Sequence, residues 1–594
     1  MTARLDTPLA ERIKRASAGL RGAIGRELER PAEPFSAASA GLLKFHGVYQ
    51  QQDRDQRRNG DGAIERPCDF MLRIKVPAGK LTSVQWKAVL DTAQDFAAGG
   101  VQLTSRQAVQ IRGVKKSDLG ESLRRVAGVG LTTLGGGGDL NCNVMCCPPI
   151  WLDPDAASEM DALADSLSQA MLPEDDGYRE TWRIGDTPGG VACASHGDGA
   201  GDVPSHSPPR FPYGTTYLPH KFKIGLACED DNCTDAMVQD IGLVAVLERG
   251  RIVGYNVVIG GGLGHVPGLP ASFPRLATPL AFVAKRDALR VVSAIAKLYR
   301  DHGNRSRRYR ARLKYLVHDW GIARIRRRLE DDLGAWLAWP RPLAITGRED
   351  HRGWRQRGDG RWMLGVHVVD GSIEDRLGIT LSTAVRRLID VPGVSLRVSP
   401  QRRLLVTGVP TEGRAAIAAI LAECGVASLH DVKALRGCSD ACAGLPYCGR
   451  AITESHRLMP RLLAELETVL VRLELADEPI CLRLVGCPAG CTRSYLAEIA
   501  VVGRTVDART LQGKYAIYVG GDRFGRRLAS LYEDLVLEND IVPVLAPLLV
   551  FFRRDGVDGE SFGDFCHRQG VRVLHDFAQA CRFDWPSPQT EFGV

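Results

Sequence analysis

Long apolar runs are missing from this chain. The longest, Ile541 to Phe552, falls well short of the ~20 residues that a membrane-spanning helix needs. The first residues, MTARLDTPLAERIKRASAGLRG, contain no apolar core of the kind that a signal peptide carries. We therefore expect a cytoplasmic protein in which thiols stay reduced.

Nucleotide-binding motifs are missing as well. There is no P-loop, and the glycine-rich segment IGGGLGH (259–265) does not fit G-x-G-x-x-G, because His265 takes the third glycine position. We expect no NADPH- or flavin-binding domain in the chain. These glycines are predicted to let the backbone approach a bulky group closely, and the run at 135–138 either does the same or forms a mobile turn.

Cysteine is present, but too sparsely for a small disulfide scaffold, with sixteen in 594 residues. In a reducing compartment such residues are buried fillers, metal ligands or catalytic groups. A hydrophobic content of 44% and a charged content of 25% exclude a disordered or fibrous chain. The length predicts three or more domains, and the net charge of +7 is a mild excess.

Alternating segments near the N-terminus are typical of β-strands, namely FMLRIKVPAG at 70–79 and VQLTSRQAVQIRGV at 101–114. Helical spacing predicts helices over 86–98 and 158–172. The stretch 185–212 is rich in Gly, Pro, Asp and Ser, and it predicts a surface loop.

The second half of the chain repeats the first weakly. LTSRQAVQIRGV (103–114) is echoed by VSPQRRLLVTGV (398–409), and an expected strand precedes each copy, at 71–76 and at 362–369. Strands alternating with helices in two related halves predict duplicated α/β domains around a shared site.

Two cysteine pairs form the sharpest motif. Cys442 and Cys448 are separated by five residues, and Cys487 and Cys491 by three, with Gly and Pro beside both pairs. Four thiolates in two close pairs can hold a zinc ion or an iron–sulfur cluster. The five-residue gap fits zinc poorly, so the spacing favours the larger cluster, with zinc and simple packing as alternatives.

These motifs resemble those of the sulfite and nitrite reductases that contain sirohaem and a [4Fe-4S] cluster. ACAGLPYCGRA (441–451) and VGCPAGCTRSYLAEIAVVG (485–503) are similar to that family's signature, and the haemoprotein subunits of assimilatory NADPH-sulfite reductases are the most similar branch. Further similar segments cover nearly the whole chain: FHGVYQQQDRD (45–55), MLRIKVPAG (71–79), LTSRQAVQIRG (103–113), YLPHKFK (217–223), GYNVVIGGGLG (254–264), GGDRFG (520–525) and GESFGDF (559–565).

The resemblance implies an α/β (α+β) fold of two pseudo-twofold repeats, with mixed sheets around a central sirohaem and a cluster-binding C-terminal portion. The expected division, in chain order, is an N-terminal extension with a candidate partner-docking role (1–60), a first ferredoxin-like half-repeat (61–150), a first sirohaem- and anion-binding α/β domain (151–335), a second half-repeat (336–425) and a second α/β domain with the cluster (426–594).

The resemblance also implies the cofactor ligands and the reaction. Cys442, Cys448, Cys487 and Cys491 would ligate the cluster, and Cys491 would bridge to the sirohaem iron. A shared thiolate couples two redox centres directly, so electrons that arrive singly can feed a six-electron reduction of sulfite to sulfide.

Basic residues stand in the segments where two anions, sirohaem and sulfite, would bind. Taken alone, each is an ordinary surface charge, although the two-residue spacing of Lys221 and Lys223 places both on one face of a strand. By resemblance, Arg73, Lys221 and Lys223 match substrate-contacting positions, and the lysines would deliver protons through ordered water. The expected cofactor contacts are Arg106, Gln110, Arg112, His220, Arg305, Lys314 and Arg523.

One position departs from the family pattern. An Asn-Arg-Asn element is normal there, whereas this chain reads DLNCNVMCCP (139–148), with Cys142 in place of the arginine of the distal anion site. Losing that cation should weaken anion binding by an amount on the order of one to three kcal/mol. Another arginine compensates, the preferred anion differs, or activity is impaired.

The densest basic stretch runs from Arg300 to Arg328, with eleven Lys and Arg against Asp301 and Asp319. It is interpreted as a set of contacts to sirohaem carboxylates, as a solvated helical face, or as a nucleic-acid surface. Among the histidines, none pairs at helical metal spacing, and His46 is predicted to be structural.

The chain needs a separate reductant, because no donor domain is recognisable. The expected partner is a flavoprotein subunit that uses NADPH, or a ferredoxin. Three alternatives to sulfite reduction stay open: nitrite reduction to ammonia with the same cofactors, a cluster- or zinc-containing nucleic-acid-binding protein, and a homologue that has kept the fold and lost turnover.

Overall fold

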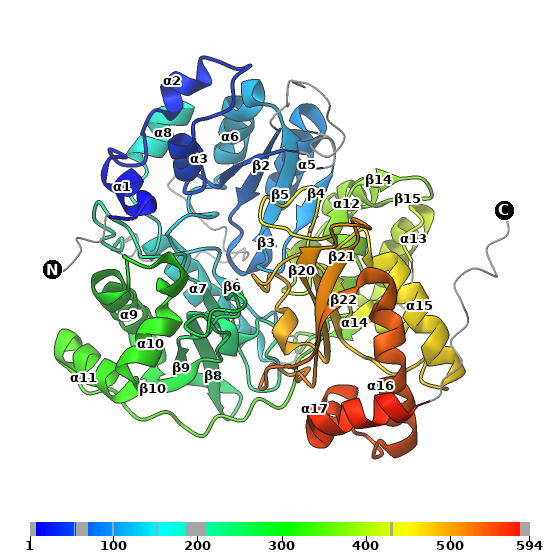
Figure 1. Cartoon of the computed structure of the whole chain (residues 1–594). Coiled ribbons are helices and arrows are strands. Elements are labelled where there is room, and N and C mark those ends of the chain that lie inside the picture. Colours follow the sequence, from blue (N-terminus) through cyan, green and yellow to red (C-terminus); the bar gives the residue numbers. More distant parts are fainter. Residues whose placement is uncertain are drawn as a thin grey trace. The chain divides into compact units, whose positions relative to one another are not determined.

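The computed structural model describes residues 7–52, 54, 69–97, 100–149, 152–185, 209–427 and 432–581 (Figure 1). Most of the loop predicted over 185–212 lies outside the described residues. The chain divides into two compact units, Met1–Asp431 and Val432–Val594, each of which is described by itself.

The first sheet of unit 1 is antiparallel. Its strand order is β1 (Val48–Gln51), β2 (Asp69–Ile74), β5 (Val109–Val114), β4 (Val101–Leu103) and β13 (Ser372–Ile373). Helices α5 (Ser83–Phe96) and α6 (Leu119–Gly128) pack together, and α5 contacts β4 and β5 through an apolar face. Thr82 and Gln85 form a capping box that begins α5. The strands predicted in this region and the helix predicted over 86–98 are confirmed.

A second sheet repeats this order. It consists of β11 (Gly353–Gln356), β12 (Trp362–Val366), β17 (Leu404–Val409), β16 (Ser395–Val398) and β3 (Lys80–Leu81), with α12 (Leu381–Ile389) and α13 (Arg414–Glu423) beside it. The two sequence echoes are β4–β5 and β16–β17, which confirms the predicted duplication. The repeats also exchange short strands at the sheet edges. β13 of the second repeat pairs with β4 of the first, and β3 of the first pairs with β16 of the second.

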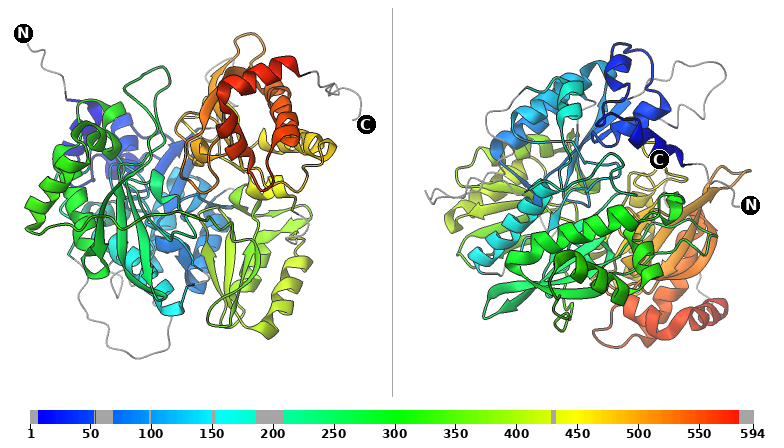
Figure 2. Two further views of the ribbon diagram at one scale, coloured as in Figure 1. Left: turned by 90° about the horizontal axis from the view of Figure 1, so that it is seen from below. Right: turned by 90° about the vertical axis from the view of Figure 1, so that its left-hand side faces the viewer.

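The third sheet of unit 1 is mixed. β6 (Met145–Cys146), β7 (Ile224–Ala227) and β8 (Ile241–Glu248) are parallel, and β9 (Arg251–Ile259) and β10 (Thr278–Ala284) continue antiparallel. Helices α9 (Ala288–His302), α10 (Leu313–Trp320) and α11 (Ile322–Leu333) contact one another and this sheet (Figure 2). The helix predicted over 158–172 is α7 (Pro154–Ala170), with Asp153 as its N-cap.

An extended segment, residues 340–352, then leads to β11 and crosses the face of unit 1 (Figure 2, left). A small hairpin, β14 (Asp375–Arg376) and β15 (Ile379–Thr380), follows in the second repeat.

The N-terminal residues are packed into unit 1. They form α1 (Leu9–Arg15), α2 (Ile24–Leu28) and α3 (Ala37–Leu43), and α8 (Asp176–Trp182) contacts α2. Leu20 and Ile24 are buried in the main core, and buried Lys14 pairs with Asp139 at 3.2 Å. His46 accepts a hydrogen bond from Trp182 Nε1 at 2.9 Å and lies 3.0 Å from the Leu20 carbonyl, so it is structural as predicted.

Unit 2 has a mixed sheet with the pairing of the third sheet. β18 (Asp440–Ala441), β19 (Leu482–Val485) and β20 (Ile499–Val506) are parallel, and β21 (Gly513–Val519) and β22 (Ser530–Leu537) continue antiparallel. Its helices are α14 (Ala434–Cys438), α15 (Met459–Arg472), α16 (Ile541–Asp555) and α17 (Phe562–Ala580). The longest apolar run forms α16, whose side chains fill the core of this unit. Among the described helices, none combines the length and the apolar character that crossing a membrane requires.

Candidate functional site

One face of the first sheet is polar. Arg73 on β2 is directly opposite Gln110 on β5, and Arg112 is two residues further along, so the three share a face. The other face carries Leu72 and Ile74, which are fully buried in the core. Strand alternation therefore sorts the predicted anion-binding residues away from the core.

Arg73 is held at this face by aromatic and backbone partners. Its Nη1 donates to the hydroxyl of Tyr49 at 3.2 Å and to the carbonyl of Gly136 at 3.3 Å, and its guanidinium lies 4.7 Å from the centre of the Tyr49 ring. Its Nε–H is buried without an acceptor among the described residues. A Cβ on Gly137 would lie 1.8 Å from the Tyr49 hydroxyl, so the glycine run at 135–138 serves close packing.

Lys221 and Lys223 flank Phe222, whose side chain is fully buried. The backbone of Phe222 bridges to that of Asn141, and the N–H of Cys142 donates to the Phe222 carbonyl at 2.8 Å. Because neighbouring side chains of an extended segment point to opposite sides, both lysines lie on the side away from Phe222. The departure from the family pattern, Cys142, is thus adjacent to the predicted substrate lysines.

Five cations, here called the cation cluster, are linked through charge interactions with Arg106 or Lys223. Arg73 and Arg312 act on Arg106, and Arg106, Lys221 and Arg312 act on Lys223. Burial lowers the pKa of Lys223 well below its usual range, and Arg106, Lys221 and Arg312 lower it further. Burial also lowers the pKa of Arg106 to about 10, partly offset by Cys142 and Asp240. The Nε–H of Arg106 is buried with no acceptor in the described part of the chain. A bound anion would relieve this charge density.

Arg312 was missed by sequence reasoning. Its Nη2 donates to Asp240 Oδ2 at 2.7 Å and its Nε to Oδ1 at 3.2 Å, and Asp240 Oδ2 also accepts the backbone N–H of Lys223 at 3.0 Å. Asp240 thus holds both the Arg312 side chain, through a bidentate ion pair, and the backbone of Lys223. Arg312 stands in the basic stretch, but its importance depends on Asp240, a partner that is distant in sequence.

The other predicted cofactor contacts are engaged within unit 1. His220 Nδ1 accepts the N–H of Lys221 at 2.8 Å. Arg305 donates to Glu11 at 2.9 Å and to the Tyr217 carbonyl at 2.6 Å. Buried Lys314 donates to the carbonyls of Gly262, Gly264 and Phe273. Arg106 donates to Gln239 and to the carbonyls of Asn143 and Ile224. Much of the Arg300–Arg328 charge therefore secures the chain itself.

A cavity of about 750 Å³ in unit 1 lies elsewhere. Its lining includes Lys80, Asp161, Asp165 and Arg397, which pair with one another at 2.9 Å for Lys80–Asp165 and Arg397–Asp161. Both of its lining carboxylates are thus paired with lining cations, and no predicted site residue lines it.

In unit 2 the four cysteines of the motif lie on loops that follow neighbouring parallel strands. Cys442 comes directly after β18 and Cys487 shortly after β19, and the N–H of Gly486 points to Cys442 Sγ at 3.4 Å. Burial raises the pKa of Cys487 to about 12, and Cys491, Cys442 and Cys448 are all near enough to raise it further. The structure thus brings the four together.

Their spacing separates the two metal alternatives. No three of these sulfurs lie within 4.8 Å of one another in the described part of the chain, whereas four thiolates on one zinc ion are ~3.8 Å apart. The wider arrangement suits a cluster. Arg523, the remaining predicted contact, lies 3.8 Å from buried Glu498.

Comparisons with known proteins agree with these motifs. Residues 64–129 match the nitrite/sulfite reductase ferredoxin-like half domain, and residues 209–336 match the nitrite and sulphite reductase 4Fe-4S domain. The sulfite reductase (ferredoxin) of Synechococcus elongatus is 35% identical over 98% of this chain and 93% of its own length. The sulfite reductase (NADPH) hemoprotein beta-component of Geobacillus thermodenitrificans is 37% identical over 94% and 95%.

The fold is also similar to that of a solved structure. The NirA protein of Mycobacterium tuberculosis superposes with a TM-score of 0.75 at 22% identity, covering 95% of this chain and 97% of that one. With two relatives at 35% and 37% identity along almost the entire length, the chain belongs to the nitrite and sulfite reductase family.

Proposed function

We propose that this protein is an assimilatory sulfite reductase haemoprotein, with sirohaem and a [4Fe-4S] cluster as its cofactors. The reaction takes one bisulfite, six electrons and six protons to one hydrosulfide and three waters. The observation that carries the proposal is the cation cluster, in which Arg73 and Arg106 each keep a buried N–H without an acceptor among the described residues. Such donors fit an anionic cofactor and an anionic substrate.

The residues present fit both cofactors. Cys442, Cys448, Cys487 and Cys491 would hold the cluster. Arg106, Gln110 and Arg112 would hold sirohaem carboxylates, whereas Arg305 and Lys314 would reach them only by giving up the contacts described above. The two cofactors would supply electrons one at a time for the reduction.

The chain's own groups then bind the substrate and move protons. Arg73, Lys221 and Lys223 orient sulfite and offset its charge. Lys223 Nζ gives up a proton more readily than an exposed lysine does, because burial and its cationic neighbours lower its pKa. The ion pair of Arg312 with Asp240 keeps the Lys223 backbone in place.

The electron donor is proposed to be a separate flavoprotein that uses NADPH, with ferredoxin as the rival donor. Relatives named for each donor are similar to this chain at nearly the same identity. The described cysteines are free thiols, which fits a reducing compartment, and we place the enzyme in the cytoplasm. Docking of the donor at the N-terminal region stays part of this proposal.

The test is an optical and EPR spectrum of the purified holoenzyme, titrated first with sulfite and then with nitrite. Sirohaem and cluster signals that respond to sulfite at lower concentration than to nitrite support the proposal. A stronger response to nitrite favours nitrite reduction, and the absence of both signals refutes the proposal.

A further inference from the structure

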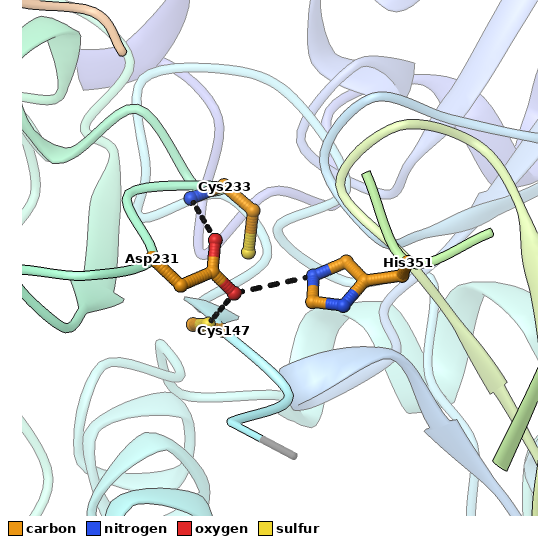
Figure 3. Close-up of side chains that lie close together, drawn as sticks. All are labelled: Cys147, Asp231, Cys233 and His351. Carbon is orange, nitrogen blue, oxygen red and sulfur yellow. Dashed lines mark hydrogen bonds and ion pairs between the residues drawn. The ribbon is translucent and has the colours of Figure 1, made fainter. Parts of the chain in front are cut away.

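Four metal-ligating side chains outside the proposed active site lie together inside unit 1 (Figure 3). They are Cys147, Asp231, Cys233 and His351, and all four are fully buried. One donor atom of each lies within 4.8 Å of the others. Cys147 Sγ is 2.6 Å from Asp231 Oδ2, and His351 Nε2 is 3.3 Å from that oxygen.

The donor set is that of a closed tetrahedral zinc site. Zinc takes thiolate at about 2.3 Å and imidazole nitrogen or carboxylate oxygen at about 2.0–2.2 Å, which places neighbouring donors ~3.3–3.8 Å apart. The observed group needs only a small contraction to reach this size. His351 Nε2 is paired with Asp231 Oδ2, as Figure 3 shows, and neither ring nitrogen makes a well-aligned hydrogen bond within the described residues, so the imidazole is oriented into the group.

The carboxylate of Asp231 is oriented by its own surroundings. Its Oδ1 accepts the N–H of Cys233 at 2.9 Å and the N–H of Glu349 at 3.0 Å. These two bonds leave Oδ2 directed at Cys147 and His351. Outer hydrogen bonds of this kind fix a ligand's direction before the metal arrives.

Two glycines allow close backbone approaches around His351. A Cβ on Gly365 would lie 1.4 Å from the His351 carbonyl oxygen, and one on Gly347 would lie 2.1 Å from the Asp230 carbonyl oxygen. Only glycine permits these approaches. The Gly347 approach brings the extended segment before β11 against the loop that follows β7, where Asp231 and Cys233 lie, and the Gly365 approach holds His351 against β12.

The duplication gives an independent observation. Ile224 to Ile241 aligns without a gap with Leu482 to Ile499, including the 3-10 turns η3 (Ala236–Val238) and η9 (Ser494–Leu496). In this alignment Cys233 is equivalent to Cys491.

Cys147 is equivalent to Cys442 in the same way. Each directly follows the first strand of its sheet, and each donates its N–H to the carbonyl of the matched leucine, Leu226 or Leu484, at 3.0 and 3.1 Å. Two positions of the proposed cluster site thus recur in unit 1. Asp231 and His351 complete a smaller, mononuclear set there.

We propose that Cys147, Asp231, Cys233 and His351 bind one Zn²⁺ ion that fastens the segment before β11 to the ends of β6 and β7. With four protein ligands and full burial the site is structural, leaving no position for substrate. The proposal stands on these four residues and does not depend on the proposed reductase activity.

The test is metal analysis of the full-length holoenzyme after dialysis against a chelator. We expect about one zinc per chain in addition to the cofactor iron. X-ray absorption at the zinc edge should show two sulfur ligands at about 2.3 Å and two nitrogen or oxygen ligands at about 2.0–2.2 Å. Cys233→Ser should lower the zinc content at least tenfold and leave the iron unchanged.

Two matched variants complete the experiment. Cys228→Ala removes a buried thiol outside the group and should keep the zinc, whereas Cys491→Ser should lose cluster iron and keep the zinc. Wild-type holoenzyme with less than a tenth of an equivalent of zinc, and no uptake of added Zn²⁺ or Co²⁺, would overturn the proposal. This measurement uses the wild-type protein, so it does not depend on whether a variant folds. A disulfide between Cys147 and Cys233 in peptide mapping would overturn it as well, and a Cys233-dependent metal that is iron would contradict the assignment to zinc.

Discussion

Replacing Lys223 by arginine distinguishes two roles of this residue, the cation that binds sulfite and the proton donor. Lys223→Arg keeps a cation beside Arg106 and Lys221, so binding of sulfite should change less than about threefold. Arginine stays protonated above pH 12 and is a poor proton donor. If Lys223 Nζ delivers protons, kcat should fall by about 10²–10⁴, which corresponds to about 3–5 kcal/mol in the activation free energy.

The pH profile gives the sign of the effect. A general acid works while protonated, so wild-type kcat should fall as pH rises through the lowered pKa of Lys223. This alkaline limb should vanish in Lys223→Arg. The assay is dye-driven sulfite reduction across pH, with Lys285→Arg as the control, because Lys285 is an exposed residue paired with Glu159. A kcat within threefold of wild type, with the alkaline limb unmoved, would refute the reasoning.

Three further outcomes are expected. Burial lowers the pKa of His46 to about 4 from 6.5, so the unfolded chain takes up that proton first as pH falls. The free energy of unfolding should therefore drop by up to about 3 kcal/mol between pH 6.5 and 4. If the urea midpoint of unfolding changes equally with pH in wild type and in His46→Asn, this expectation is contradicted. Cys142→Arg should tighten apparent sulfite binding by an amount on the order of one to three kcal/mol in an optical titration, and unchanged or weaker binding would exclude the idea. Cys491→Ser should lose cluster iron and acid-labile sulfide, while Cys481→Ser, a buried cysteine outside the motif, should retain both; equal losses would argue against the ligand assignment.

The sequence predicted features that depend on neighbouring residues. Strand alternation identified β2, β4 and β5, and the echo between 103–114 and 398–409 identified the duplication. The cysteine pairs were visible because each pair lies within one loop. The exchange of β3 and β13 between the repeats was not predicted, because two-residue strands carry no periodicity.

Features that join distant segments escaped prediction. Arg312 gains its role from Asp240, and Cys147, Asp231, Cys233 and His351 come from three separate segments with no common spacing. Conversely, Arg305 and Lys314 stand in a matching segment, yet their donors are used by Glu11 and by backbone carbonyls. Contacts of this kind are set by tertiary packing, and charge alone does not reveal them.

The electron count per product tests the central claim most directly. Purified holoenzyme would be supplied with a reduced viologen dye and limiting sulfite, and both oxidised dye and released sulfide would be measured. A sulfite reductase of this kind should consume six electrons for each sulfide and release no partly reduced sulfur species. Dye oxidation without sulfide, or a ratio near two electrons per sulfite consumed, would contradict the account.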